Sequence, residues 1–100
     1  MNTPQKGKFR HIVFKDGDTW YAVALEFNIV ESNDDPKLAF MSLLHAVAGY
    51  VQSCKKLKGA RHAPLNQKAD LEYEKFWKIL TSPKALKSPY LVDMYGYSRV

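Results

Sequence analysis

Cysteine, long apolar runs and clustered glycine are all scarce in this 100-residue sequence. Cys54 is the only cysteine, which excludes an internal disulfide and any metal site built on paired cysteines. No run reaches the 18 apolar residues typical of a membrane-spanning helix, and residues 1–8 lack the apolar centre of a signal peptide. We therefore expect a soluble, cytoplasmic protein with no membrane partner.

Motifs that indicate catalysis or a bound cofactor are also missing. The sequence has no glycine-rich phosphate-binding loop and no G-x-S-x-G nucleophile turn. His11, His45 and His62 form no i, i+4 pair and have no neighbouring cysteine, so no metal site is predicted. Residues 16–18, Asp-Gly-Asp, could begin a calcium loop, but Phe27 occupies the twelfth position, where such a loop needs glutamate. The sequence therefore predicts a protein that is not an enzyme and holds no cofactor.

Charges of one sign are absent from two long stretches. Residues 16–36 contain six acids and no Lys or Arg, whereas residues 36–69 contain six bases and no acid. The formal charges of these stretches are −6 and +6, within a net charge of +5. This polarity can steer a charged partner, although two solvated patches that keep a domain soluble are the commoner case.

What the sequence does contain is a series of strands followed by helices. Strands are predicted over about residues 9–14, 20–27 and 29–32, which are rich in aromatic and β-branched residues, with Asp16-Gly17 in a hairpin turn. In the second strand, alternation predicts one face that points to the core, made of Tyr21, Val23, Leu25 and Phe27. The opposite face contains Trp20, Ala22, Ala24 and Glu26.

A long amphipathic helix is predicted over residues 36–56, because apolar residues recur there at spacings of four and three. Asp35 is its predicted N-cap and Pro36 its first residue. A second helix is expected over about 70–80, and a strand over about 90–95 that ends at Gly96. The predicted fold class is α+β, a single domain over residues 1–100 in which one long helix crosses one face of an antiparallel sheet. Its core spans about 8–56 and its C-terminal extension 57–100.

Residues 9–54 together resemble the HicB-like family, the antitoxin-type domains of bacterial type II toxin–antitoxin systems. The resemblance is carried by the hairpin FRHIVFKDGDTWYAVALEF, the strand NIVES, the helix entry NDDPKLAF and the helix LLHAVAGYV. Asn33 stands where the family usually has glycine, and Asp35 replaces its usual threonine cap. Both roles are kept, because Asn tolerates a left-handed conformation and Asp caps as well as Thr.

The resemblance implies a β-β-β-α-β core similar to a partial RNase H fold that lacks the catalytic carboxylates, and often self-association. It also implies binding to a small mRNA-cleaving HicA-type toxin. A non-catalytic, antitoxin-type module that neutralises such a toxin is the leading hypothesis, and an orphan HicB-like domain without a toxin remains open. The candidate partner-binding residues are Glu26, Glu31, Asp34 and Asp35. Binding of operator DNA is not expected, because Pro83 and Pro89 leave no room for a second long helix.

The alternative hypothesis is a small RNA-binding protein. The basic segment 54–61 can contact phosphates without reading sequence, through Lys55, Lys56, Lys58 and Arg61. No aromatic residue lies between Tyr50 and Tyr73, so this region lacks a platform on which bases could stack. An RNase H-like nuclease is the least favoured hypothesis, because two-metal chemistry needs clustered carboxylates.

Self-association as a dimer is expected from the apolar composition. The sequence is 46% hydrophobic and 13% aromatic, more than one sheet face and one helix stripe readily cover. The predicted pairing surface is the face of the second strand that carries Trp20, Ala22 and Ala24. The alternative is that the second helix and the tail cover this face within one chain, using Phe76, Trp77, Tyr90 and Tyr95.

Overall fold

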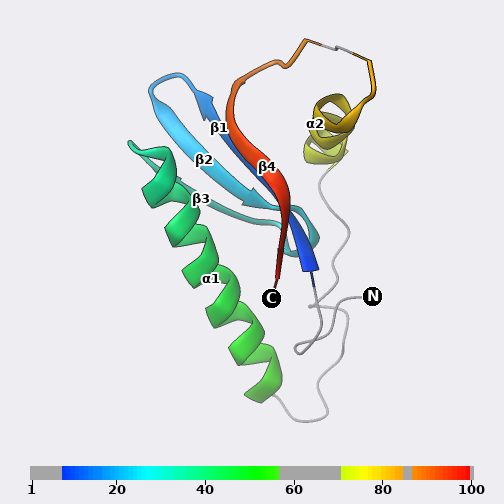
Figure 1. The fold of residues 1–100 in the computed structure, drawn as a ribbon. Helices are drawn as coiled ribbons and strands as arrows, with labels where there is room; N and C mark the ends of the chain where they lie inside the picture. Colours follow the sequence, from blue (N-terminus) through cyan, green and yellow to red (C-terminus); the bar gives the residue numbers. More distant parts are fainter. Residues whose placement is uncertain (1–7, 57–70, 85–86, 100) are drawn as a thin grey trace.

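The structure, a computed structural model, describes residues 8–56, 71–84 and 87–99 (Figure 1). Its elements are β1 (Lys8–Asp16), β2 (Thr19–Ala24), the 3-10 turn η1 (Leu25–Phe27), β3 (Ile29–Asn33), α1 (Pro36–Lys56), α2 (Leu71–Thr81) and β4 (Leu91–Arg99). The four strands form one antiparallel sheet in the order β3-β2-β1-β4. This is the predicted α+β class, with one long helix across one face of the sheet. The likeness to a partial RNase H fold stays a prediction.

The hairpin of β1 and β2 forms the centre of the sheet. Its pairing runs from His11 with Ala24 to Asp16 with Thr19, which leaves a two-residue turn. Gly17 has a φ of 64° in this turn, a left-handed conformation that glycine adopts without steric cost. The other edge of β1 pairs with β4, so chain segments far apart in sequence lie side by side at the middle of the fold.

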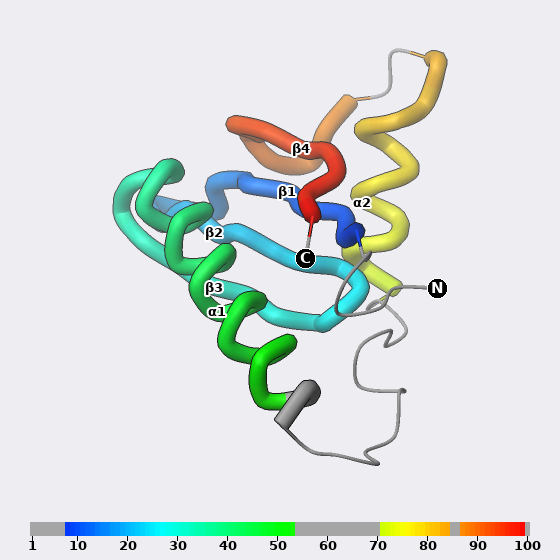
Figure 2. Tube along the Cα trace, turned by 60° about the horizontal axis from the view of Figure 1, so that its bottom comes forward, coloured from blue at the N-terminus to red at the C-terminus, as the bar shows by residue number. Residues whose placement is uncertain are grey.

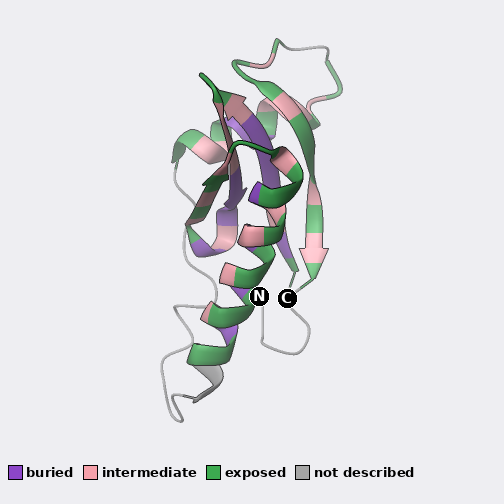
Figure 3. Ribbon diagram, turned by 90° about the vertical axis from the view of Figure 1, so that its left-hand side faces the viewer, coloured by how far each residue is buried: buried purple, intermediate pink, exposed green. Residues whose placement is uncertain are grey.

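The two helices pack on opposite faces of this hairpin, as Figure 2 shows. The face beneath α1 includes Phe9, Val13, Ala22 and Ala24, which pack against four buried residues of the helix: Ala39, Leu43, Val47 and Val51. The face beneath α2 includes Ile12, Phe14, Val23 and Leu25, which pack against Phe76 and Trp77. Buried residues therefore concentrate in β1 and β2 (Figure 3), and the molecule has three layers.

The predicted core face of β2 is buried, but the expectation that its opposite face is open was wrong. Tyr21, Val23 and Leu25 do face a helix, but that helix is α2, whereas α1 covers the opposite face. Ala22 and Ala24 are fully buried beneath α1, so the proposed pairing surface on strand β2 is not open. Both faces of β2 are apolar, and alternation alone cannot say which helix covers which face.

The end of β2 also differs from the prediction. The strand stops at Ala24, and Leu25–Phe27 form η1, which closes with Asn28 in the left-handed conformation (φ 53°, ψ 37°). This turn breaks the alternation, so Phe27 belongs to the cluster beneath α1 rather than to the face of Val23. Asn28 is the only described residue other than glycine with positive φ, so Asn33 does not take the left-handed conformation expected of it.

The entry to α1 confirms the predicted cap. Asp35 Oδ1 accepts hydrogen bonds from the backbone N–H of Lys37 (2.8 Å) and of Leu38 (3.2 Å). Asn33 contributes through its side chain, since its Oδ1 accepts a bond from the Asp35 N–H (3.1 Å). These local bonds start the helix at Pro36, and its bounds match the prediction.

The C-terminal elements are present, but β4 is longer than predicted. It continues past Gly96 to Arg99, because β1 offers a partner along its whole length, with Gly96 opposite His11. A Cβ at position 96 would lie 3.7 Å from His11 Cε1, an ordinary van der Waals distance, so glycine is favoured here by its φ of 157° and not by lack of space. Among the described residues, no helix has the length and apolarity needed to cross a membrane.

Candidate functional site

Arg10 on β1 binds two carboxylates, Glu26 in η1 and Glu74 in α2, and the second of these joins the sheet to α2. No pattern in the sequence groups these three residues. Its guanidinium donates two bonds of 2.7 Å to the two carboxylate oxygens of Glu74, and its Nε donates a bond of 2.7 Å to Glu26. The backbone N–H of Arg10 donates a further bond of 2.6 Å to Glu26. The Arg10 Cζ also lies 5.6 Å from the centroid of the Trp77 ring.

This network is structural, because its charges satisfy one another. The hydrogen bonds from Arg10 hold the pKa of Glu74 below its usual value, and those to Glu74 raise the pKa of Arg10, so both stay ionised near neutral pH. No local signal predicts the pair, since the two residues are separated by 64 positions. Glu26, a predicted partner-binding residue, is only 18% exposed at its side chain and is already bound to Arg10.

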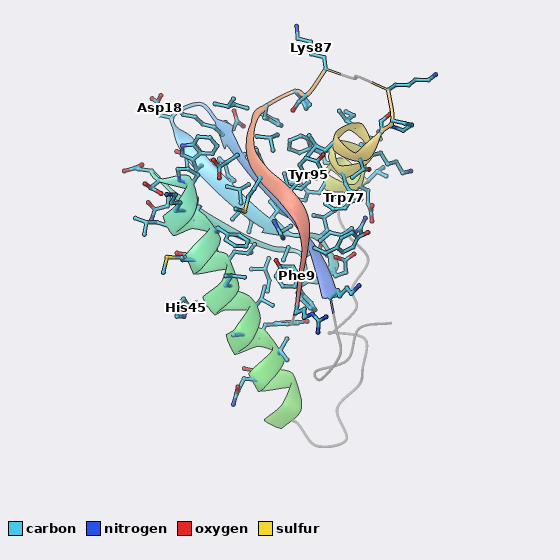
Figure 4. All side chains as sticks on the ribbon, viewed as in Figure 1. Phe9, Asp18, His45, Trp77, Lys87 and Tyr95 are labelled. Carbon is cyan, nitrogen blue, oxygen red and sulfur yellow. The ribbon has the colours of Figure 1, made fainter. Side chains whose placement is uncertain are left out.

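Four exposed aspartates gather at one end of the sheet, which we call the acidic end: Asp16, Asp18, Asp34 and Asp35. The strand register explains this, since Asp16 pairs with Thr19 and Trp20 pairs with Asn33, which brings the hairpin turn beside the entry to α1. Figure 4 shows Asp18 at the same end of the molecule as the start of α1. Two of the four predicted partner-binding residues, Asp34 and Asp35, therefore belong to the acidic end. Glu31 is half-buried on β3, opposite Ala22, and Glu26 lies apart from it.

An open pocket of about 460 Å³ lies between the β1–β2 hairpin, α2 and the segment that precedes β4. We call it the aromatic pocket; its lining consists of Phe14, Asp16, Tyr21, Glu72, Tyr73, Lys75, Phe76, Ile79, Pro89 and Tyr90. Phe14 is the centre of a group of rings, with centroids 5.7 Å from Tyr21, 5.3 Å from Phe76 and 5.0 Å from Tyr90. The volume of the aromatic pocket is in the range of sites that bind small molecules or single anchoring side chains. Asp16 belongs to both the pocket and the acidic end.

Strand β4 carries a third surface of interest. Leu91, Met94, Tyr95 and Tyr97 are large apolar or aromatic side chains that remain between 38% and 66% exposed. Tyr95 and Tyr97 make edge contacts with the Trp77 ring, at 6.0 Å and 5.5 Å between centroids, and Figure 4 labels Tyr95 beside Trp77. In the described part of the chain, only β1 pairs with β4, so the outer edge of β4 has no neighbouring strand.

His11 is buried between β1, β4 and α1. Its Nδ1 lies 2.8 Å from the Ser98 hydroxyl, and its ring centroid lies 4.9 Å from that of Phe40. Burial lowers the pKa of His11, so the ring is neutral at neutral pH. Within residues 8–56, 71–84 and 87–99, no three His, Cys, Asp or Glu side chains come close enough to hold a metal ion.

The structure does not describe the side chains on which the RNA-binding hypothesis depends. Lys58 and Arg61 lie outside the described residues, and the same is true of the side chains of Lys55 and Lys56 at the end of α1. RNA binding through residues 54–61 therefore stays a prediction.

Comparisons with protein-family models, curated proteins and solved structures gave no match to this chain.

Proposed function

We propose that this protein is a non-catalytic binding module of the HicB-like antitoxin type, which neutralises a small, basic, mRNA-cleaving toxin. One observation carries the proposal: the acidic end adjoins the aromatic pocket, and Asp16 belongs to both. The resemblance of residues 9–54 to HicB-like sequences supports the class of partner.

The two parts of this surface suit different tasks in recognition. Aromatic pockets hold the large side chains that contribute most of the binding energy at protein interfaces. Exposed charges around such a pocket contribute less affinity, but they steer an oppositely charged partner and raise its association rate. A basic toxin would therefore approach the acidic end and place one apolar or aromatic side chain in the pocket.

The structure also changes the set of residues that we assign to this surface. Glu26 is left out, because binding a partner would require it to leave Arg10. Glu31 is also left out, because it is half-buried on β3. Asp16 and Asp18 take the place of these two residues beside Asp34 and Asp35, and Tyr21 and Tyr90 are the pocket residues that we expect to contact the partner.

The first experiment is co-purification with the product of a small basic reading frame beside this one, followed by calorimetry. Asp18→Asn combined with Asp34→Asn raises the net charge by two at the acidic end. We expect this variant to bind about tenfold more weakly, with a slower association rate whose salt dependence is reduced.

The matched control is Gln52→Lys with Ser53→Lys, which adds the same charge at exposed positions on α1. These positions are about 25 Å along the helix from its start at 1.5 Å per residue. Equal loss of affinity in both variants would mean that net charge alone causes the loss, and it would reject the acidic end as the binding surface. The absence of any neighbouring toxin frame, or a frame whose product does not bind, would reject the antitoxin assignment itself.

A further inference from the structure

The outer edge of β4 is long and apolar, which is unusual for an exposed edge. The strand has nine residues, LVDMYGYSR, and contains no proline or lysine. Natural edge strands are usually short, or are protected by Pro, by charged side chains or by β-bulges, because their free backbone groups otherwise pair with another strand. In β4 the bulge lies at Asp93, and residues 94–98 have none of these protections. Figure 2 shows β4 as the last strand at one side of the sheet.

The sequence of β4 is complementary to itself when it is reversed about Gly96. In an antiparallel pair of two β4 strands centred on Gly96, Asp93 stands opposite Arg99 of the second copy, and Tyr95 stands opposite Tyr97. The twofold axis repeats each pair, so two opposite-charge pairs flank two aromatic pairs. A register shifted by two residues would lose the pairing of Asp93 with Arg99.

We propose that two copies of this protein associate through their β4 edges in this register, forming a continuous eight-stranded sheet. The pairing is isologous, as in most homodimers, and it gives partners to the outer backbone groups of β4, which pair with no other strand in the described part of the chain. This β4 interface is a different surface from the acidic end and the aromatic pocket, and its formation does not require a toxin.

Residues 94–98 of β4 fit this register. Tyr95 pairs with Ile12 and Tyr97 with Arg10, so both tyrosines lie on the α2 face of the sheet. Directly opposite residues share a face, which places Tyr95 of one copy beside Tyr97 of the other, next to Trp77. Residues 94–99 pair regularly with β1, whereas the register shift between Val13 and Phe14 leaves Asp93 at a bulge on β4. The regular part, 94–98, is the part centred on Gly96.

The decisive experiment uses two single charge reversals, Asp93→Arg and Arg99→Glu, on the purified protein alone. Both residues are exposed, so neither change disturbs the core. In a homodimer of either variant, both flanking pairs become like-charged, and we expect the dimer dissociation constant to rise roughly thirtyfold. An equimolar mixture of the two variants restores both pairs, since in the heterodimer each position 93 again faces a position 99 of opposite charge.

Sedimentation and native mass spectrometry would measure the wild type, each variant and the mixture, from low micromolar to near-millimolar concentration. The expected result is a wild-type dimer, two weakened homodimers and a heterodimer that forms preferentially on mixing. Lys37→Glu and Lys84→Glu are charge reversals at exposed positions away from β4, and they should leave the dimer unchanged. A wild-type monomer over the whole range, or a dimer whose mixture shows no preference for the heterodimer, would overturn the proposal.

Discussion

Replacing Arg10 by Met should separate α2 from the sheet more than it destabilises the rest of the fold. Met keeps an apolar stem against Trp77 but removes three side-chain hydrogen bonds, one to Glu26 and two to Glu74. These side chains are partly exposed, at 18% for Arg10 and Glu26 and 31% for Glu74, so solvent screens part of the interaction. The backbone N–H of Arg10 still binds Glu26 in the variant.

Because these groups are partly exposed, their contribution to the free energy of unfolding should lie between those of exposed and of buried ion pairs. We expect Arg10→Met to lower the free energy of unfolding by about 2 kcal/mol, and Glu74→Gln by about 1 kcal/mol. For a domain of this size, the first value corresponds to a Tm lower by about 10 °C. The coupling energy between the two positions in a double-mutant cycle should be about 1 kcal/mol.

Urea unfolding followed by tryptophan fluorescence measures these free energies, and hydrogen exchange locates the effect. Amides of α2 should lose protection in Arg10→Met, while those of β1 and β2 keep theirs. Lys75→Met is the control, since it removes an exposed cation from α2 and should change stability by less than about 0.5 kcal/mol. A coupling energy near zero, or an equal loss of protection throughout the sheet, would refute the view that this network docks α2.

The helix cap and the buried histidine give two further predictions. Asp35→Ala should lower the free energy of unfolding by about 1 kcal/mol through loss of the cap to Lys37 and Leu38, whereas Asp35→Asn should retain most of it; thermal unfolding compares them, and equal losses would argue against capping. For His11, the folded pKa lies below the unfolded value of 6.5, so the unfolded state binds more protons and stability falls as pH drops below 6.5 towards the folded pKa. The slope should approach at most about 1.4 kcal/mol per pH unit, and His11→Gln should flatten it in urea titrations between pH 7 and pH 5; an unchanged slope would assign it to other groups.

The parts of the fold that were predictable from sequence are those specified by neighbouring residues. The bounds of α1 follow from its N-cap Asp35, from Pro36 and from a regular apolar stripe, all of which act within a few residues. The face of β2 that carries Ala22 was wrongly expected to be open, because Ala22 and Val23 are both fully buried and the pattern contains no information about which helix covers each face. Covering both faces requires α2, whose position depends on contacts with residues about 60 positions earlier.

The candidate site likewise has parts that could be predicted from sequence and parts that could not. The acidic stretch was evident in the sequence, but only the strand register shows that its hairpin turn and helix entry meet, and that Glu26 is directed elsewhere. The aromatic pocket could not be predicted, since Phe14, Phe76 and Tyr90 come from three separate segments. The length of β4 was underestimated, because a glycine that ends an isolated strand can continue one that pairs closely with a neighbour.

The order of elements along the chain affects how the protein folds during its synthesis. Residues 8–56 can assemble β1, β2, β3 and α1 as soon as they leave the ribosome, but the second face of the hairpin and the free edge of β1 wait for residues 71–99. At about 5–20 residues per second, this interval lasts roughly 2 to 9 s. During that time Ile12, Phe14 and Val23, which the finished protein buries, lack the cover of α2 and lie beside the unpaired edge of β1. The nascent chain is therefore at its most aggregation-prone, and most dependent on chaperones, between the completion of α1 and the arrival of β4.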